Sequence, residues 1–264
     1  MKRLLHLSDL HFGRDRPEVL GPLLTAIRDL QPDLVVISGD LTQRATDAQF
    51  QSAARFIKAI GAPVLTIPGN HDVPLHNLLM RVLIPWRRYR RWINANLEPT
   101  YEDDEITVAG VNTVNPLAWQ RGWLKSATLK RVCQTIAASK DSRIHVLVVH
   151  HPLEHLPDER KQLMRGASEG IQRLAESGAD VVLSGHLHSW RVEPFAVVEG
   201  QHATLQVHAG TSLSNRLRGE VNDFNLLEIE SDHIKVVRHA YDDAKGGFAT
   251  TSALHFRASG NGWH

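Results

Sequence analysis

Three apolar runs near the N-terminus set the topology, and they read LLHLSDLH at residues 4–11, LVVISGD at 34–40 and VLTIPGNHD at 64–72. Each run is short and aliphatic and ends in polar residues, as a buried strand does. Between the runs, apolar residues recur at helical spacing from Val19 to Leu30 and from Phe50 to Ile60. This β-α-β-α-β order predicts an α/β protein with a largely parallel sheet and helices on its faces.

The rest of the chain continues and then changes this pattern. Two more β-branched runs, 144–149 and 181–183, again end in polar loops. After about residue 192, strand-like runs follow one another without helices, and they cover 192–198, 203–208, 226–229 and 233–239. We therefore expect residues 192–240 to supply most of a second, more antiparallel sheet. No Pro-, Gly- or Ser-rich linker divides the chain, so residues 1–264 are predicted to form one domain.

Composition excludes several classes of protein. The chain has 264 residues, and 30 Lys and Arg against 29 Asp and Glu give a net charge of +1. This balance argues against a stable nucleic-acid partner, which needs an extended basic surface. The single cysteine, Cys133, excludes an intrachain disulfide. No apolar run reaches the roughly 18 residues that a membrane-spanning helix needs, and we expect a soluble cytoplasmic protein.

Side chains of the types that bind metals follow five of the predicted strands. Sites in open α/β sheets form at the carboxyl ends of strands, so strand register should bring these loops to one edge of the sheet. Carboxylate, amide and imidazole ligands without thiolate suit Mn, Fe or Zn. The set is too large for one ion and fits two ions that share a bridging carboxylate. Its members are Asp9, His11, Asp40, Asn70, His71, His150, His186 and His188.

These residues stand in five ordered blocks, which are Asp9-Leu10-His11, Gly39-Asp40, Gly69-Asn70-His71-Asp72, Val149-His150-His151-Pro152 and Gly185-His186-Leu187-His188. The blocks resemble those of the calcineurin-like metallophosphoesterase superfamily. Their residue patterns are most similar to those of the bacterial class III cyclic-nucleotide phosphodiesterase and glycerophosphodiesterase group. The resemblance implies a four-layer αββα sandwich of two mixed β-sheets flanked by helices. It also implies a dinuclear metal centre, formed by loops between residues 9 and 188, that hydrolyses phosphate diesters through a metal-held hydroxide.

The resemblance further implies a role for each ligand. Asp9, His11 and His188 would hold one ion, Asn70, His150 and His186 the other, and Asp40 would bridge them. His150 and His151 compete for one ligand position, which the family pattern gives to His150. His151 is then either a donor behind the ligands or a residue packed under Pro152.

Two neighbouring residues are implied to act on the substrate. His71, with Asn70 beside it, would contact the phosphoryl group, stabilise its developing charge and protonate the leaving oxygen. Asp72 would orient the imidazole of His71, as carboxylates often do for histidine.

A basic-aromatic cap segment, residues 76–97, follows the third block. It contains five arginines and three aromatic residues, with apolar residues at helical spacing and a kink expected at Pro85. One interpretation is an amphipathic cap helix with solvated arginines. The other is that 81–92 contacts an anionic substrate, a membrane surface or a lipid-linked substrate, with Arg87 and Arg91 as substrate contacts.

Several functions therefore remain open at this point. The leading hypothesis is a phosphodiesterase for a small diester such as 3′,5′-cyclic AMP. The rivals are a lipid-linked pyrophosphate hydrolase of the UDP-2,3-diacylglucosamine type, which the cap segment favours, and a nuclease, which the net charge disfavours. A binding module without catalysis is a fourth alternative, against which the complete ligand set argues. A homodimer is compatible with the sequence but not required by it.

Overall fold

The N-terminal part of the chain alternates strands and helices as predicted. The computed structural model describes residues 1–138, 143–154, 162–195, 202–259 and 262–264. Thr46 caps the second helix by accepting a hydrogen bond from the backbone N–H of Gln49, and Gly61 ends that helix in the left-handed conformation. The first elements are β1 (Lys2–Leu7), α1 (Pro17–Leu30), β2 (Leu34–Ile37), α2 (Asp47–Ile60), β3 (Val64–Thr66) and the single turn η1 (Asn70–Asp72).

Within the described residues, two mixed sheets form. The first has the order β13-β12-β11-β10-β1-β2-β3, in which β1, β2 and β3 are parallel and β10 to β13 are antiparallel. The second has the order β4-β5-β6-β7-β9-β8, with a parallel centre and antiparallel edges. The further strands are β4 (Thr100–Glu102), β5 (Ile106–Gly110), β6 (Ile144–Val148), β7 (Val181–Ser184), β8 (Arg191–Pro194), β9 (Leu205–His208), β10 (Asp223–Ile229), β11 (His233–Asp242), β12 (Gly247–Ser259) and β13 (Gly262–Trp263).

This arrangement corrects the prediction that residues 192–240 supply the second sheet. Only β8 and β9 join that sheet, whereas β10 and β11 extend the first sheet from the free edge of β1. The expected strand 192–198 covers only the end of β8 before it leaves the described residues at 196. The physical reason is that β10 is a strand with large apolar residues on both faces, such as Leu226 and Leu227, so its local sequence does not specify which buried sheet edge it joins.

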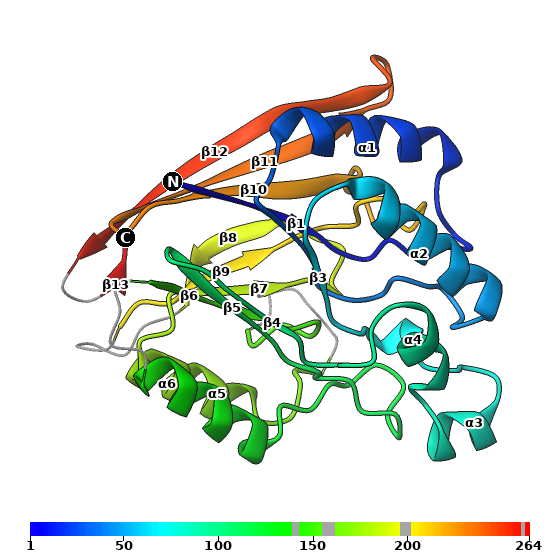
Figure 1. Cartoon of the computed structure of the whole chain (residues 1–264), viewed down its shortest axis with the longest axis horizontal. Helices are drawn as coiled ribbons and strands as arrows, with labels where there is room; N and C mark the ends of the chain where they lie inside the picture. The colour runs from blue at the N-terminus through cyan, green and yellow to red at the C-terminus, as the bar shows by residue number, and fades with distance from the viewer. Residues whose placement is uncertain (139–142, 155–161, 196–201, 260–261) are drawn as a thin grey trace.

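The layers confirm the four-layer sandwich (Figure 1). Val35 and Ile37 of β2 pack towards α1 and α2, while Leu34 and Val36 face the second sheet, because successive strand residues point to opposite faces. The outer face of the second sheet is covered by α5 (Ser126–Ala138) and α6 (Ala167–Ser177). The central strands of both sheets are therefore buried on two faces, which explains their near-continuous apolar runs.

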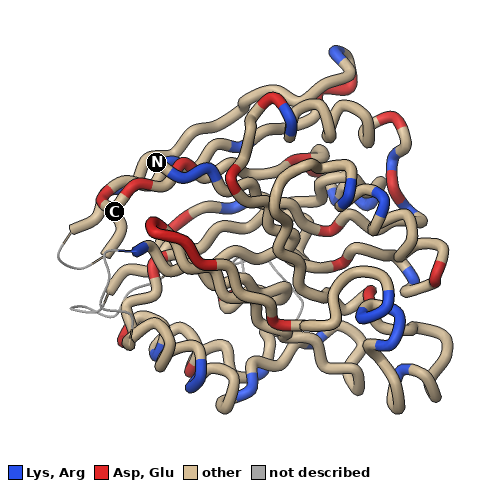
Figure 2. Tube along the Cα trace, in the orientation of Figure 1, with Lys and Arg blue, Asp and Glu red and all other residues tan. Residues whose placement is uncertain are grey.

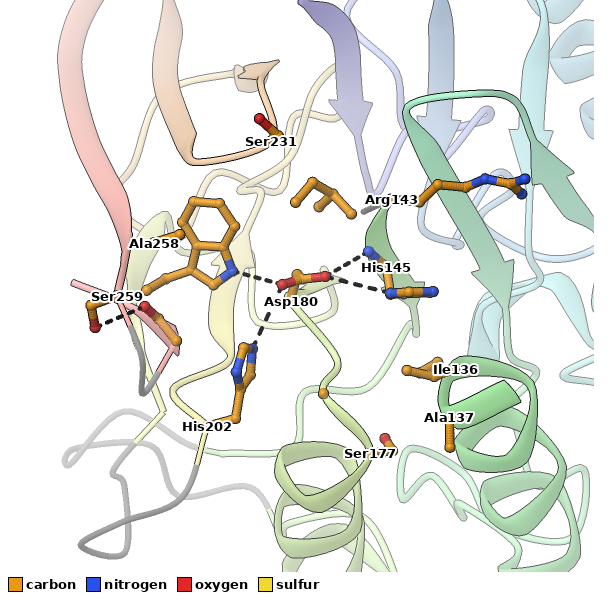
Figure 3. A pocket seen from close by; sticks show the side chains of 14 residues that line it. Ile136, Ala137, Arg143, His145, Ser177, Asp180, His202, Ser231, Ala258 and Ser259 are labelled. Carbon is orange, nitrogen blue, oxygen red and sulfur yellow. Dashed lines mark hydrogen bonds and ion pairs between the residues drawn. The ribbon is translucent and has the colours of Figure 1, made fainter. Parts of the chain in front are cut away.

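The C-terminal strand is hydrogen-bonded to a residue of the second-sheet layer, Asp180. Trp263 in β13 is buried, and its indole N–H donates a hydrogen bond of 3.0 Å to Oδ1 of Asp180. Asp180 also accepts a hydrogen bond of 2.8 Å from the backbone N–H of His145 and lies between the imidazoles of His145 and His202 (Figure 3). One buried carboxylate thus joins the last strand to β6 and to the start of β7.

The cap segment forms two short helices rather than one. They are α3 (Leu78–Leu83) and α4 (Arg87–Trp92), and Pro85 lies between them as expected of a residue that cannot continue a helix. Tyr89 of α4 is fully buried, and its hydroxyl lies 2.9 Å from Oγ1 of Thr66. Across the described part of the chain, no helix has both the length and the hydropathy needed to cross a membrane.

Candidate metal centre

The predicted ligands come from both sheets. The loop after β1 supplies Asp9 and His11, the loop after β2 supplies Asp40, and the turn after β3 supplies Asn70. The loop after β6 supplies His150, and the loop after β7 supplies His186 and His188. The prediction of one sheet edge is therefore wrong in detail: the carboxyl ends of the two sheets meet. Asp9 joins them directly, because its Oδ2 accepts a hydrogen bond of 2.9 Å from the backbone N–H of His186.

The backbone at these loops is strained. Five of the candidate ligands, Asp9, His11, Asp40, His186 and His188, have φ between 48° and 70°. This left-handed region is uncommon for residues other than glycine and costs about 1–3 kcal/mol each. Such strain persists only where the surroundings enforce it, and it concentrates at functional sites.

Asp9, His11 and His188 form the first cluster. Oδ1 of Asp9 lies 3.1 Å from Nε2 of His188 and 3.5 Å from Nε2 of His11, and the two imidazole nitrogens are 3.3 Å apart. All three residues are buried. Oδ1 of Asp9 has no hydrogen-bond partner among the described residues, whereas Oδ2 is used by Ser8 and His186. A buried carboxylate oxygen aimed at two imidazole nitrogens fits a cation.

Asp40 stands between this cluster and a second one. Its Oδ2 lies 3.6 Å from Nε2 of His11 and 3.5 Å from Nε2 of His150. On the far side, Oδ1 of Asn70 lies 3.1 Å from Nε2 of His150. Burial opposes the ionisation of Asp9 and Asp40, but the neighbouring imidazoles outweigh it and hold the pKa of both carboxyls well below the usual range.

His186 and His151 complete the second cluster. The ring centre of His186 lies 5.1 Å from that of His150 and 4.7 Å from that of His151. His150, His151 and His186 can present nitrogens within 4.8 Å of one another. His151 also places Nδ1 2.8 Å from the hydroxyl of Thr113, so its ring is anchored to the segment that follows β5.

Backbone carbonyls fix the tautomer of two of these histidines. Nδ1 of His150 donates to the carbonyl oxygen of Ser38, and Nδ1 of His188 donates to that of Arg216, both at 2.8 Å. Each bond leaves the lone pair of Nε2 directed into the centre, which is how proteins orient metal-binding imidazoles. The donor set, its burial and its orientation therefore fit metal ions.

His71 lies at this centre, but its partners differ from the predicted ones. Its Nδ1 lies 3.0 Å from the carbonyl oxygen of Gln43, its backbone N–H donates to Oδ1 of Asp40 at 2.7 Å, and its ring contacts His11. Asp72 does not hold the imidazole: its carboxylate accepts hydrogen bonds from Leu41, Thr42 and Gly69. Asp72 therefore fixes the backbone that carries Asp40.

One residue at the centre was missed by the sequence analysis. Nη1 of Arg216 donates a hydrogen bond of 3.2 Å to Nε2 of His71, so the proton of that imidazole stands on Nδ1, against Gln43. Arg216 is half-buried and lies in the loop between β9 and β10. The nearest sequence signal was His208 with the run Gly210-Thr211-Ser212 after it, which stands at the end of β9 and matches none of the five blocks.

The predicted substrate contacts Arg87 and Arg91 lie elsewhere. Both are exposed on α4, and the guanidinium of Arg91 stacks on Trp92 at 5.0 Å. Within the described residues, neither forms a hydrogen bond or ion pair with a residue of the metal-binding loops.

Comparison with known proteins agrees with this geometry. The model of the calcineurin-like phosphoesterase family matches residues 2–190 of the chain. The chain belongs to the calcineurin-like phosphoesterase family. It is thus a hydrolytic phosphoesterase, with metal ions implied by its fold and by the clusters described above.

Sequence relatives within the family carry phosphodiesterase names. A probable cyclic nucleotide phosphodiesterase of Synechococcus sp. is 24% identical over 70% of this chain and 72% of its own length. A probable cyclic nucleotide phosphodiesterase of Pseudoalteromonas sp. is 26% identical over 71% of this chain and 71% of its own length. The glycerophosphodiester phosphodiesterase GpdQ of Enterobacter lignolyticus is 33% identical, but over 26% of this chain and 29% of its own.

Solved structures confirm the fold. A purple acid phosphatase from yellow lupin superposes with a TM-score of 0.69 at 13% identity over 96% of this chain, which spans 53% of that protein. Vacuolar protein sorting 29 of Cryptosporidium parvum superposes with a TM-score of 0.53 at 14% identity, over 97% of this chain and 98% of its own.

Proposed function

We propose that this phosphoesterase is a two-metal phosphodiesterase. The observation that carries the proposal is the position of Asp40, whose Oδ2 lies within 3.6 Å of an imidazole nitrogen in each cluster. On this proposal Asp9, His11 and His188 hold one ion, Asn70, His150 and His186 hold the other, and Asp40 bridges them. Two such ions, when bound, supply Lewis acidity for a phosphoryl oxygen and make water a stronger nucleophile at neutral pH.

The remaining groups at the centre suit a phosphate diester. The Arg216 guanidinium can exchange its hydrogen bond to His71 for one to a phosphoryl oxygen, because anions are its preferred acceptors. That exchange frees the Nε2 lone pair of His71, which faces the centre beside Asp40, to take up a proton from solvent and then donate it to the leaving oxygen. Gln43 then holds the ring from behind through Nδ1.

The substrate we propose to test first is 3′,5′-cyclic AMP. Its support is that two relatives, which align with about 70% of this chain, are named probable cyclic nucleotide phosphodiesterases. A small soluble diester also agrees with the near-zero net charge, which disfavours a long nucleic acid.

The decisive experiment measures metal content and turnover together. We expect about two Mn²⁺ per chain and hydrolysis of bis(p-nitrophenyl) phosphate and 3′,5′-cyclic AMP. Asp40→Asn should lose both ions and all turnover, while the exposed Asp29→Asn should keep both. His71→Ala should keep the ions and lose about 100-fold or more in kcat.

Each outcome bears on a different part of the proposal. Two tightly bound ions in Asp40→Asn would reject the bridge, and metal loss in His71→Ala would reject its assignment to the substrate. Turnover of the generic diester without cyclic AMP would keep the mechanism and reject the nucleotide.

A further inference from the structure

Seven large apolar side chains are exposed beside the metal centre. Leu78, Leu79, Val82, Leu83 and Ile84 belong to α3 and its end, and Leu117 and Trp119 belong to the loop that precedes α5; we call these seven the α3 patch. Their exposed fractions run from 42% to 78%. Isolated exposed apolar residues are ordinary in proteins, but a contiguous group of this size marks a surface that binds something.

Arg81 holds the two parts of the α3 patch together. It is buried, and its guanidinium donates hydrogen bonds to the carbonyl oxygens of Pro116 and Ala118 at 2.6 and 2.7 Å and to that of Pro74 at 3.2 Å. The same group lies 5.5 Å from the ring of Trp119. On α3, residues 78, 79, 82 and 83 share one side, because positions four apart are neighbours on a helix.

Both parts of the α3 patch border the metal centre. On one side, α3 follows His71 of η1 by a few residues, and Arg81 ties it back to Pro74. On the other, Gly122 belongs to the same loop as Trp119, and a Cβ on it would lie only 2.5 Å from Nδ1 of His151. Whatever covers the α3 patch therefore lies at the rim of the centre.

Exposed positive charge adjoins the α3 patch. Arg87, Arg90 and Arg91 of α4 are exposed. The sequence has no acidic residue between Asp72 and Glu98, and basic positions mark the trace of α4 (Figure 2). Within the described residues, these three arginines form no ion pair. Arg88 differs, because Asp47 binds its guanidinium at 2.9 Å and also accepts from Trp92.

We propose that the α3 patch inserts into the interface of an anionic lipid bilayer, with Arg87, Arg90 and Arg91 among the headgroups. A helix with exposed leucines, a nearby Trp and flanking arginines has the chemistry that interfacial binding requires. A second copy of the chain fits less well, because self-pairing would bring like-charged arginines together with no acidic partners in this segment. That the docked centre then meets lipid-borne phosphate diesters rests on the two-metal phosphodiesterase activity proposed above, and not on cyclic AMP as its substrate.

The test measures sedimentation of the full chain with vesicles. We expect binding to vesicles of phosphatidylcholine and phosphatidylglycerol and much weaker binding to phosphatidylcholine alone. Leu79→Ser/Leu83→Ser should weaken binding about tenfold or more, whereas Val221→Ser, at another exposed apolar side chain, should not. Each of Arg87→Gln and Arg90→Gln should weaken it about fivefold, against no change for the exposed Arg28→Gln.

Other outcomes overturn the proposal. These are the absence of binding, equal binding to both vesicles, or a concentration-dependent dimer that Leu79→Ser/Leu83→Ser dissociates, which would make the α3 patch a subunit interface. Hydrolysis of soluble bis(p-nitrophenyl) phosphate by the same variant reports on the metal centre separately. An active enzyme without vesicle binding rejects only the membrane proposal, and vesicle binding without turnover rejects only the proposed function.

Discussion

His71 and Arg216 show how single side chains share one task at the centre. The imidazole is fixed through Nδ1 by Gln43, so Nε2 has one direction in which to act, and Arg216 stands in that direction. The backbone carbonyl of Arg216 also orients His188. Arg216 therefore contributes through two groups, its backbone carbonyl and its guanidinium, and on the proposed mechanism only the guanidinium would contact the substrate.

Arg216→Gln separates these two contributions. Because the backbone carbonyl remains, we expect unchanged metal content, together with a 10- to 100-fold lower kcat/KM, as for the loss of about 1.5–3 kcal/mol from one charged hydrogen bond. The control is Arg14→Gln, which changes an exposed arginine in a neighbouring loop. Loss of metal would show a structural role instead, and an unchanged kcat/KM would remove Arg216 from substrate binding.

At the scale of elements, Asp180 connects β6, β7 and β13. Burial opposes its ionisation, but hydrogen bonds from His145, His202 and Trp263 outweigh burial and lower its pKa to about 2. The same carboxyl in an unfolded chain titrates near 3.9. Because the folded pKa is the lower one, ionised Asp180 stabilises the fold above about pH 4, and this contribution disappears as the pH falls towards 2.

Asp180→Asn should therefore destabilise the protein in a pH-dependent way. We expect a loss of about 2 kcal/mol in the free energy of unfolding near neutral pH, and a smaller difference from wild type near pH 3. Urea unfolding of chelated protein measures both values without a contribution from metals. Asp29→Asn serves as the exposed control, and a loss that does not depend on pH would contradict the ionised hydrogen-bond acceptor.

At the scale of the molecule, the metal centre joins the two sheets. Asp9 and Asp40 extend from the first sheet, and His150, His186 and His188 from the second, so ions held between them would cross-link the sandwich. Without ions, the centre brings two buried carboxylates close together. A ligand that binds only the folded state raises stability according to its concentration and affinity.

Removal of metal should consequently lower the thermal stability of the whole chain. At Mn²⁺ concentrations about 100-fold above Kd, we expect each ion to add about 2.7 kcal/mol, or about 5 kcal/mol for the pair, and a chelator to lower Tm by roughly 10–20 °C. Calorimetry with and without EDTA measures this shift. Asp40→Asn should show almost no shift, and an equal shift in that variant would place the stabilising ions at another site.

Much of the site could be predicted from local sequence. The residues around Asp9, Asp40, Asn70, His150 and His186 each follow a buried apolar strand, and the structure brings all five loops together. Strand ends and ligand types are encoded within a few residues, since burial and the polar break that follows it are local properties. The predicted partnership of Asp72 with His71 failed because adjacency in sequence does not set side-chain direction.

Only the tertiary structure decided the rest. Strands β10 and β11 joined β1 rather than the second sheet, since an edge accepts any strand with suitable faces and the choice depends on the whole packing. Arg216 reached His71 across 145 residues of sequence, and Arg88 was bound to Asp47 while Arg87 stayed exposed. The sequence alone determined the α/β class and the candidate metal-binding side chains, because these follow from short-range pattern. Long-range partners depend on how the two sheets meet, and no local pattern contains that information.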